Sequence, residues 1–266
     1  MLYICGTPIG NLEDMTFRQI NTLKTVDLIA AEDTRHSRKL LTHFEIQTPM
    51  TSYHEHNKAE KTNYLIKEML AGKQIALITD SGMPVISDPG LEIVAQCYEH
   101  GIQVTTVPGP TAFVSGFVLS GISSGRFVFE GFLSKKQKKH IDYLKTEERA
   151  IILYESPHKL LNTLQRLNEV LGSERVIAVT RELTKKYEEV KRMTLGEAVS
   201  YYESNTPMGE FVLVIEGQVQ EKEVSDVPII TQVENYINQG YAKNDAIKQV
   251  AKDMELPKRV IYQACI

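Results

Sequence analysis

Loops rich in glycine, proline and small polar residues follow three short apolar runs, and they are the stretches of this chain best suited to hold a ligand. The longest spans residues 79–90 (Thr-Asp-Ser-Gly-Met-Pro-Val-Ile-Ser-Asp-Pro-Gly), and the others span residues 5–11 and 107–112. A strand, such a loop and then a helix form ligand sites at the carboxyl ends of parallel strands. Three of these loops on one sheet predict a single cleft for a flat and mostly neutral ligand.

Acidic and basic side chains gather after the apolar run 28–31, in the sequence Glu-Asp-Thr-Arg-His at residues 32–36. Asp33 or Thr34 could simply cap the next helix, which would account for one residue of the group. An acid, a base and a histidine together at a strand end favour a functional role for the whole group.

The segment Tyr-His-Glu-His-Asn at residues 53–57 holds the densest group of titratable side chains. His54 and His56 alternate, so in a strand both would face one side and could bind a metal. No third ligand follows at a suitable spacing, so we expect no metal site. A loop that orients a polar substrate, or a solvated turn, is the preferred interpretation.

Common nucleotide-binding fingerprints are absent from the sequence. Gly6 and Gly10 are separated by three residues, one of them a proline, which departs from the G-x-G-x-x-G pattern, and there is no G-x-x-x-x-G-K-[ST] phosphate loop. The cysteines, at positions 5, 97 and 265, form no C-x-x-C pair. Neither a leader sequence nor a membrane span is apparent, so we expect a cytoplasmic protein with no membrane partner.

The 266-residue chain has a formal net charge of −4 and a pI of about 6.0. This balance argues against a protein that coats nucleic acid through bulk charge, although a local basic patch is compatible with it. The best candidate patch is the lysine run at residues 135–139. Such a run is otherwise an ordinary solvated start of a helix.

Alternating apolar runs and amphipathic segments predict an α/β protein of two domains with a small helical module after them. We expect the domains at residues 1–118 and 126–218, and a helix-turn-helix-like module at residues 228–266. Polar loops also end strands of the second domain, and they would face the first domain across a cleft. The expected strands are 2–4, 28–31, 74–78, 102–106, 126–129, 150–154, 176–179 and 211–215, and the longer helices are 34–44, 59–71, 91–98, 134–148 and 157–171.

Seven motifs follow one another along the chain: Gly-Thr-Pro-Ile-Gly-Asn-Leu at 6–12, Glu-Asp-Thr-Arg at 32–35, Ser-Tyr-His-Glu-His-Asn at 52–57, the loop 79–90, Pro-Gly-Pro-Thr-Ala at 108–112, Tyr-Glu-Ser-Pro-His at 154–158 and Arg-Glu-Leu-Thr-Lys at 181–185. In this order they resemble the tetrapyrrole methylase superfamily, and within it the branch that acts on ribosomal RNA. The resemblance implies two α/β domains with S-adenosylmethionine (SAM) between them, and a homodimer. It also implies 2′-O-methylation of a cytidine in the decoding region of 16S rRNA, with the rRNA or the small ribosomal subunit as partner.

Positions in these motifs imply a set of cofactor-binding residues. Tetrapyrrole-acting relatives carry a G-D-P-type sequence in the third loop, where this chain has Gly82-Met83-Pro84. The exchange of Asp for Met favours the RNA-acting branch. The implied cofactor-binding residues are Pro8, Gly10, Asp80, Gly82, Met83, Val85, Thr111, Ala112, Tyr154, Leu183 and Gly209.

A ribose hydroxyl becomes a good nucleophile as it loses its proton, so the site needs a base or a hydrogen-bond acceptor. We expect Asp33 or His56 to take the proton and Arg35 to hold a neighbouring phosphate, with Glu155 and Lys185 as further candidates. Two other functions stay open: methylation of a small tetrapyrrole precursor, and SAM sensing by a non-catalytic RNA-binding protein. The residues expected to bind RNA are Lys135, Lys136, Lys138, Lys139 and Lys185.

Overall fold

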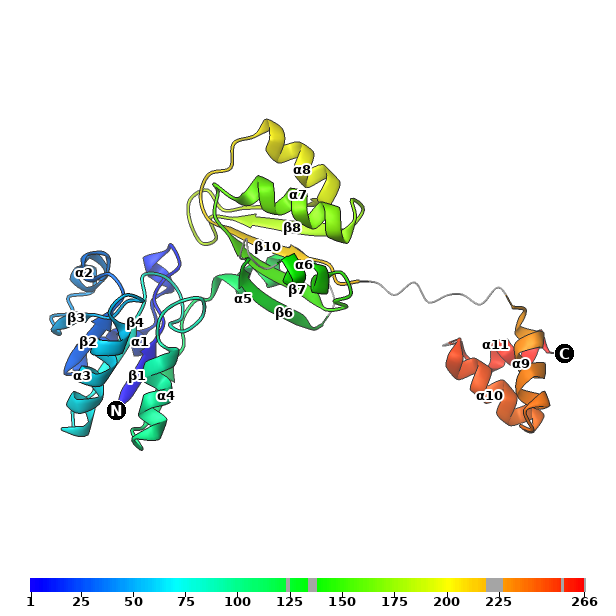
Figure 1. Cartoon of the computed structure of the whole chain (residues 1–266), viewed down its shortest axis with the longest axis horizontal. Helices are drawn as coiled ribbons and strands as arrows, with labels where there is room; N and C mark the ends of the chain where they lie inside the picture. The colour runs from blue at the N-terminus through cyan, green and yellow to red at the C-terminus, as the bar shows by residue number, and fades with distance from the viewer. Residues whose placement is uncertain (123–124, 134–137, 219–226, 255, 266) are drawn as a thin grey trace. The chain divides into compact units, whose positions relative to one another are not determined.

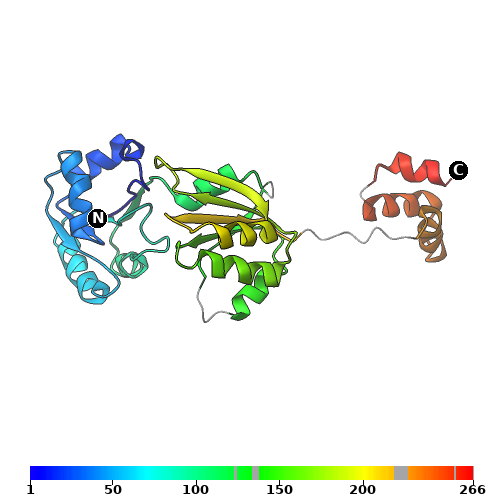
Figure 2. The same cartoon turned by 90° about the horizontal axis from the view of Figure 1, so that it is seen from above.

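The computed structural model describes residues 1–122, 125–133, 138–218, 227–254 and 256–265, without the side chains of residues 138–140. The chain forms two compact units, Met1–Gln218 and Val219–Ile266 (Figure 1). The larger unit contains two five-stranded sheets, one after the other along the chain (Figure 2). The predicted α/β class is confirmed.

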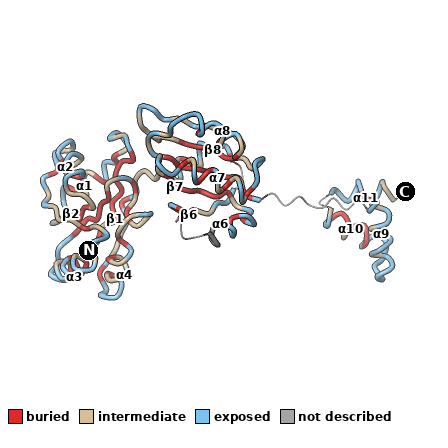
Figure 3. Tube along the Cα trace, turned by 45° about the horizontal axis from the view of Figure 1, so that its top comes forward, coloured by how far each residue is buried: buried red, intermediate tan, exposed pale blue. Residues whose placement is uncertain are grey.

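The first sheet is parallel throughout, with strand order β3-β2-β4-β1-β5. Helices cover both faces: one core joins the sheet to α3 and α4, and another joins it to α1 and α2. Its inner strands are apolar because a parallel sheet is buried on both sides (Figure 3). The strands are β1 (Leu2–Cys5), β2 (Leu28–Ala31), β3 (Met50–Ser52), β4 (Ile75–Ile78) and β5 (Val104–Val107). The helices are η1 (Leu12–Asp14), α1 (Phe17–Thr25), α2 (Thr34–His43), α3 (Lys58–Leu70) and α4 (Leu91–Glu99).

The second sheet is mixed, with strand order β6-β7-β10-β8-β9 and only β6 and β7 parallel. Helices α7 and α8 share a core with one face, whereas Phe113 and Phe117 of α5 pack on the other. Helix α5 straddles the expected boundary at residue 118 and contacts β7, β8 and β10. The strands are β6 (Phe127–Phe132), β7 (Ala150–Glu155), β8 (Val176–Arg181), β9 (Glu189–Thr194) and β10 (Phe211–Ile215). The helices are α5 (Ala112–Ser120), α6 (Lys138–Leu144), α7 (Leu160–Leu171) and α8 (Leu195–Ser204).

Two strands, β3 and β9, were not expected from the sequence. Both lie at an edge of their sheet, where one side of the strand lacks a neighbour and polar residues are tolerated. The helix expected over residues 134–148 ends earlier, at Leu144, and residues 134–137 lie outside the described residues. After it, Glu147 bonds both the backbone and the guanidinium of Arg149 and so favours a turn.

The smaller unit is a bundle of three helices, α9 (Ile229–Asn238), α10 (Lys243–Asp253) and α11 (Lys258–Ala264). Val233, Ile247 and Ile261 meet in its core. The Tyr236 hydroxyl also donates a hydrogen bond to Asp253 Oδ2 at 2.6 Å, which ties α9 to the end of α10. In the described ranges, no helix has both the length and the apolarity needed to cross a bilayer.

Candidate functional site

The three glycine-rich loops are joined to one another at the carboxyl ends of β1, β4 and β5. Thr7 and Gly82 exchange backbone hydrogen bonds of 2.8 and 3.2 Å, which pairs the first loop with the loop 79–90. A Cβ on Gly6 would lie 2.9 Å from the Cα of Gly109 and 2.8 Å from Met83 Sδ. The absence of a side chain at Gly6 therefore permits the close backbone approach that brings the loops together.

Backbone strain is concentrated in two loops of the larger unit. Val85 and Ser87 have φ of 77° and 65°, and Glu182 and Thr184 have φ of 51° and 66°. Residues other than glycine rarely adopt such values, and each costs about 1–3 kcal/mol. Both loops contribute residues to the lining of one cavity. Strain of this kind is typical of ligand-binding segments.

A cavity of about 440 Å³ lies between the two sheets of the larger unit. Its volume is in the range of small-molecule sites. The first half of the chain contributes loops 79–90 and 107–112, and the second half contributes the ends of β7 and β10. The lining residues are Ile9, Ser81, Gly82, Met83, Ile86, Ser87, Asp88, Thr111, Ala112, Phe132, Tyr154, Glu155, Ser156, Pro157, Leu183, Glu210, Phe211 and Val212.

Tyr154 forms a rigid aromatic wall of this cavity. Its hydroxyl oxygen accepts a hydrogen bond from the Phe113 backbone N–H at 3.1 Å. Its ring meets Phe129 and Phe132 edge-on, with centroids 4.9 and 5.6 Å apart. Burial raises the pKa of the Tyr154 hydroxyl to about 12, so the side chain is neutral at physiological pH. This wall suits the flat, mostly neutral face of an adenine ring.

Every charged side chain in the cavity lining is a carboxylate: Asp88, Glu155 and Glu210. Burial, together with the nearby carboxylates of Glu32 and Asp80, raises the pKa of Asp88 to about 7. Carboxylates around a partly buried cavity favour a ligand that carries positive charge. The sulfonium of SAM fits this set of groups.

Glu155 is held rigidly at the end of β7. Its Oε1 accepts a 2.7 Å hydrogen bond from the Ser156 backbone N–H, and its Oε2 accepts one of 2.6 Å from Thr163 Oγ1. Its side chain is buried. Glu155 thus presents a carboxyl group of fixed orientation to the cavity, with both oxygens engaged in hydrogen bonds.

The predicted cofactor-binding residues divide into two groups. Gly82, Met83, Thr111, Ala112, Tyr154 and Leu183 line the cavity together. The other five are absent from the lining: Pro8, Gly10, Asp80, Val85 and Gly209.

Two of the glycines outside the lining serve close packing. A Cβ on Gly10 would collide with the Lys185 side chain, and one on Gly209 would lie 2.6 Å from Glu182 Cγ. Sequence reasoning missed Asp88 and Glu210 among the lining residues. Asp88 lies inside the recognised loop 79–90, and Glu210 directly follows Gly209, so the motifs themselves were the signal that could have found them.

Asp33 and Arg35 lie at the start of α2 and are outside the cavity lining. Asp33 is the N-cap of α2, and its Oδ2 pairs with Arg35 Nη2 at 3.0 Å. Hydrogen bonds from the Arg35 side chain and backbone lower the pKa of Asp33 to about 2. The backbone N–H of Asp33 donates to Asp80 Oδ1 at 3.2 Å, which links this pair to the loop 79–90.

His56, the third expected member of this group, is exposed in the turn before α3. Its ring centroid lies 6.1 Å from that of His54. His54 is the more enclosed of the two, and its buried Nδ1 has no hydrogen-bond partner among the described residues. Burial raises the pKa of Glu32, and the electrostatic effect of His54 opposes this rise. Among the described residues, no three His, Cys, Asp or Glu side chains lie close enough together to hold a metal ion.

Lys185, which was expected to bind RNA, has two carboxylate partners. Its Nζ lies 3.0 Å from Glu182 Oε1 and 2.7 Å from Glu210 Oε2. Of the other expected RNA contacts, Lys135 and Lys136 lie outside the described residues. Lys138 and Lys139 begin α6, and their side chains are also outside the description.

The cavity between two α/β layers, lined by strained loops and carboxylates, is that of a methylase fold. Residues 1–199 match the family Tetrapyrrole (Corrin/Porphyrin) Methylases. The chain is 48% identical to "Ribosomal RNA small subunit methyltransferase I" of Synechocystis sp. over 99% of its length and 96% of the relative. It is 47% identical to the protein of that name from Bacillus subtilis, over 99% of this chain and 93% of the relative. The chain belongs to the tetrapyrrole methylase family.

A shorter relative with the same name comes from Thermotoga maritima. It is 43% identical over 219 residues, which cover 82% of this chain and 98% of the relative. That matched length is within one residue of the 218 residues of the larger unit.

Solved structures show the same fold. Diphthine synthase has a TM-score of 0.64 at 12% identity, covering 82% of this chain and 90% of that one. The uroporphyrin-III C-methyl transferase from Thermus thermophilus, complexed with S-adenyl homocysteine, has a TM-score of 0.59 at 17% identity, covering 80% and 96%. The expected SAM-dependent methyltransferase class is confirmed by this family membership and fold.

Proposed function

We propose that this enzyme methylates the 2′-oxygen of a cytidine ribose in the decoding region of 16S rRNA. The observation that carries the proposal is the near full-length similarity to relatives named for methylating small-subunit rRNA. Met83 lines the cavity at the place where tetrapyrrole-acting relatives carry Asp, which supports the RNA-acting branch. A ribosomal substrate would place the enzyme in the cytoplasm. We further propose a homodimer, as the family resemblance implies.

SAM supplies an electrophilic methyl group, which the ribose oxygen receives as the bond between methyl carbon and sulfur breaks. The protein's part is alignment, and alignment of two reactants can supply a large share of the rate. Tyr154 and Met83, which come from different halves of the larger unit and both line the cavity, would hold the cofactor in one orientation. Fixed carboxylates such as Glu155 stabilise positive charge without reorganising water. The target nucleotide would leave its stack to reach the site.

The acceptor side of the site is proposed to consist of Asp33, Arg35 and His56. With a pKa of about 2, Asp33 is ionised at neutral pH and can accept a hydrogen bond from the ribose hydroxyl, although it is a weak base. Its bond to Arg35 would aim the guanidinium at a neighbouring phosphate. His56, exposed in the turn before α3, is the other proposed proton acceptor. Glu155 and Lys185 are the reserve candidates for the acceptor side, and Lys185, whose pKa is raised by its glutamate partners, could act there only as a hydrogen-bond donor.

Transfer of labelled methyl from SAM to small subunits that lack the modification tests the function. The expected product is a single 2′-O-methylcytidine in 16S rRNA. The Asp33→Asn and His56→Ala variants test the acceptor side, with SAM affinity as the control for folding. At least one should lose turnover by about 100-fold. Wild-type turnover in both, with SAM still bound, would reject their assignment and turn attention to Glu155→Gln.

The small-molecule alternative is tested in the same reaction format. The Thermus thermophilus fold relative is named as a uroporphyrin methylase, which keeps a free porphyrinoid as the second candidate substrate. Methyl transfer to uroporphyrinogen III and none to ribosomal subunits would favour it. SAM binding with no methyl transfer to either substrate would favour the third possibility, a non-catalytic RNA-binding protein that senses SAM.

A further inference from the structure

Helix α2 carries an unusual concentration of positive charge for an acidic protein. Its cations are Arg35, Arg38 and Lys39, its histidines are His36 and His43, and it has no carboxylate. All five side chains are exposed to solvent. The chain as a whole has a net charge of −4, so this helix is a local reversal of the prevailing sign.

Two of these cations have no partner of opposite charge. Within the described part of the chain, Arg38 and Lys39 make no ion pair and no side-chain hydrogen bond. Arg35, in contrast, is bound to Asp33, and Lys185 is bound to two glutamates. Arg38 and Lys39 therefore have their charge available for an external anion.

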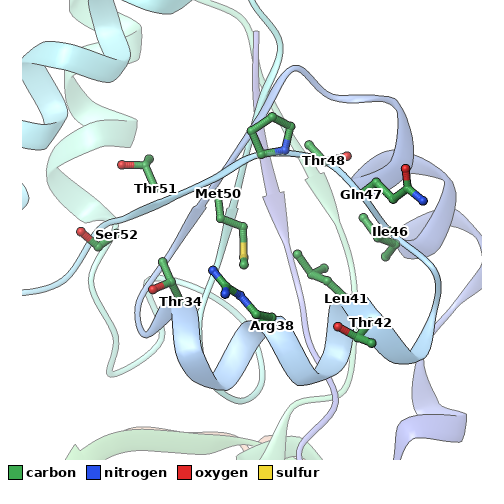
Figure 4. Close-up of a pocket in the computed structure, with 11 residues that line it drawn as sticks. Thr34, Arg38, Leu41, Thr42, Ile46, Gln47, Thr48, Met50, Thr51 and Ser52 are labelled. Atoms are coloured by element: carbon green, nitrogen blue, oxygen red, sulfur yellow. The ribbon is translucent and has the colours of Figure 1, made fainter.

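Arg38 also lines a groove of about 560 Å³ between α2 and the edge strand β3 (Figure 4). The Arg38 side chain extends from α2 toward the segment that carries Met50. Among the lining residues Arg38 is the one charged side chain, and no carboxylate is present. The remaining polar side chains carry hydroxyls and one amide, and they are Thr34, Thr42, Gln47, Thr48, Thr51 and Ser52.

Helix α3 extends the basic rim beyond β3. Lys61 Nζ donates to Thr51 Oγ1 at 3.0 Å, so its ammonium lies at the groove wall. The same ammonium lies 5.3 Å from the ring centroid of Tyr64, which is 42% exposed. A cation beside an exposed aromatic ring is a common arrangement for binding single-stranded nucleic acid, because bases stack on the ring. The nearby acid Glu55 is paired with Lys58.

The groove reaches the same end of the sheet as the loops of the cofactor site, because Thr34 and Ser52, at the carboxyl ends of β2 and β3, line it. Strands β3 and β4 are the two neighbours of β2, so their ends lie about 10 Å apart. The Asp33 cap that begins α2 is bonded to Asp80 in the loop that lines the cofactor cavity. A chain of nucleotides could therefore run from the groove to the cavity along one edge of the sheet.

We propose that the α2–β3 groove, with Arg38 and Lys61 at its wall and Lys39 next to Arg38 on α2, binds the phosphodiester backbone of the RNA strand that flanks the target nucleotide. Arg38 would hold a phosphate through paired N–H donors, and the hydroxyls would contact phosphate and sugar oxygens. A groove without carboxylates matches such a polyanion, whereas the carboxylate-lined cofactor cavity does not. This inference rests on the proposed action on rRNA, and it specifies where on the protein the RNA strand next to the target nucleotide binds.

The test compares the full-length protein with its Arg38→Glu/Lys39→Glu variant. The probe is a fluorescein-labelled single-stranded RNA that spans the target region, followed by anisotropy at several salt concentrations. A matched control reverses two exposed lysines on other helices of the same domain, Lys24→Glu/Lys67→Glu, and gives the same net charge. Arg38→Gln separates loss of a contact from added repulsion.

The groove variant should bind the RNA about tenfold more weakly or worse, and its salt slope should fall by about two, one for each lost phosphate contact. The control should lose much less, and SAM affinity should be unchanged in both. On small subunits, the groove variant should raise KM and leave kcat near the wild-type value.

Equal RNA affinity and equal KM in the groove and control variants would overturn the proposal. A raised KM on assembled subunits together with unchanged affinity for the naked RNA would also overturn it, because the groove would then bind a ribosomal protein and not RNA. If the wild-type protein transfers no methyl to RNA, the proposed function fails, while the affinity comparison still decides whether the groove binds RNA.

Discussion

Replacing Asp88 with Asn should separate the binding of SAM from the stability of the fold, because the two change in opposite directions. Asp88 lines the cofactor cavity, and burial beside Glu32 and Asp80 raises its pKa from 3.8 to about 7. The ionised form attracts the sulfonium, and the same ionised form is disfavoured by its surroundings.

The effect on affinity can be worked from Coulomb's law. A carboxylate and a unit positive charge about 6 Å apart in a partly buried site interact by about 1–2 kcal/mol once solvent screening is included, or about five- to thirtyfold in Kd. The loss should be largest at pH 8, where Asp88 is ionised, and small at pH 6. In the wild-type protein, SAM affinity should therefore rise with pH through about 7.

The effect on stability has the opposite sign. The folded state holds the Asp88 proton up to about pH 7, whereas the unfolded chain releases it near pH 3.8, so wild-type stability falls as pH rises between these values. The full shift sets an upper bound of about 4 kcal/mol, and we expect about 1–2 kcal/mol of stabilisation by Asp88→Asn at pH 8. Little change is expected at pH 4.

Isothermal titration with SAM and with S-adenosylhomocysteine, which lacks the sulfonium charge, measures the first effect. Urea unfolding without ligand at the two pH values measures the second. Equal losses for the two ligands would show that Asp88 acts through shape rather than charge. A pH dependence of SAM binding that persists in Asp88→Asn would assign the titration to another group.

Three further predictions concern the scaffold of the site. Gly6→Ala places a Cβ 2.9 Å from Gly109 Cα, so we expect about 1–3 kcal/mol of destabilisation and weaker SAM binding; an unchanged urea midpoint would contradict the loop packing. Tyr154→Phe leaves the Phe113 N–H without its hydrogen-bond partner and should lower the free energy of unfolding by about 1–3 kcal/mol; an unchanged free energy of unfolding would contradict this prediction. Truncation after Gln218 should leave SAM affinity within about twofold, since the cavity lies wholly in the larger unit; loss of binding in a folded truncated protein would show that the helical unit contributes to the site.

The sequence predicted the elements whose burial leaves a strong pattern. The apolar run that forms β4 is buried along its whole length. Thr194 and Glu197 form a capping box, a pattern readable in the sequence, at the start of α8. Strand β9 has Glu189, Lys191 and Arg192 among its six residues, and its place beside β8 depends on long-range pairing that no local pattern records. Tertiary pairing of this kind overrides local composition.

The cofactor cavity shows a similar division between what motifs reveal and what geometry decides. The loop 79–90 was recognisable from its glycines and prolines, but it contains two aspartates with different roles. Asp80 turns toward the backbone of Asp33, whereas Asp88 lines the cavity. Between these two aspartates, the backbone adopts positive φ at Val85 and Ser87. Neither residue type predicts such values, so the direction in which the loop turns could not be read from the sequence.

The chain passes from the first sheet to the second only once among the described residues, between the end of β5 and the start of α5. Pro108 and Pro110 restrict this crossing, and Thr111 and Ala112 at its end line the cofactor cavity. The crossing is thus a conformationally restricted link between the two sheets and also forms part of the wall of the cofactor cavity. We expect the parts of the larger unit before and after this crossing to unfold in separate transitions when the cavity is empty. A ligand bound across the crossing would couple them into one cooperative transition, so a differential scanning trace with two overlapping peaks should merge into one as SAM is added.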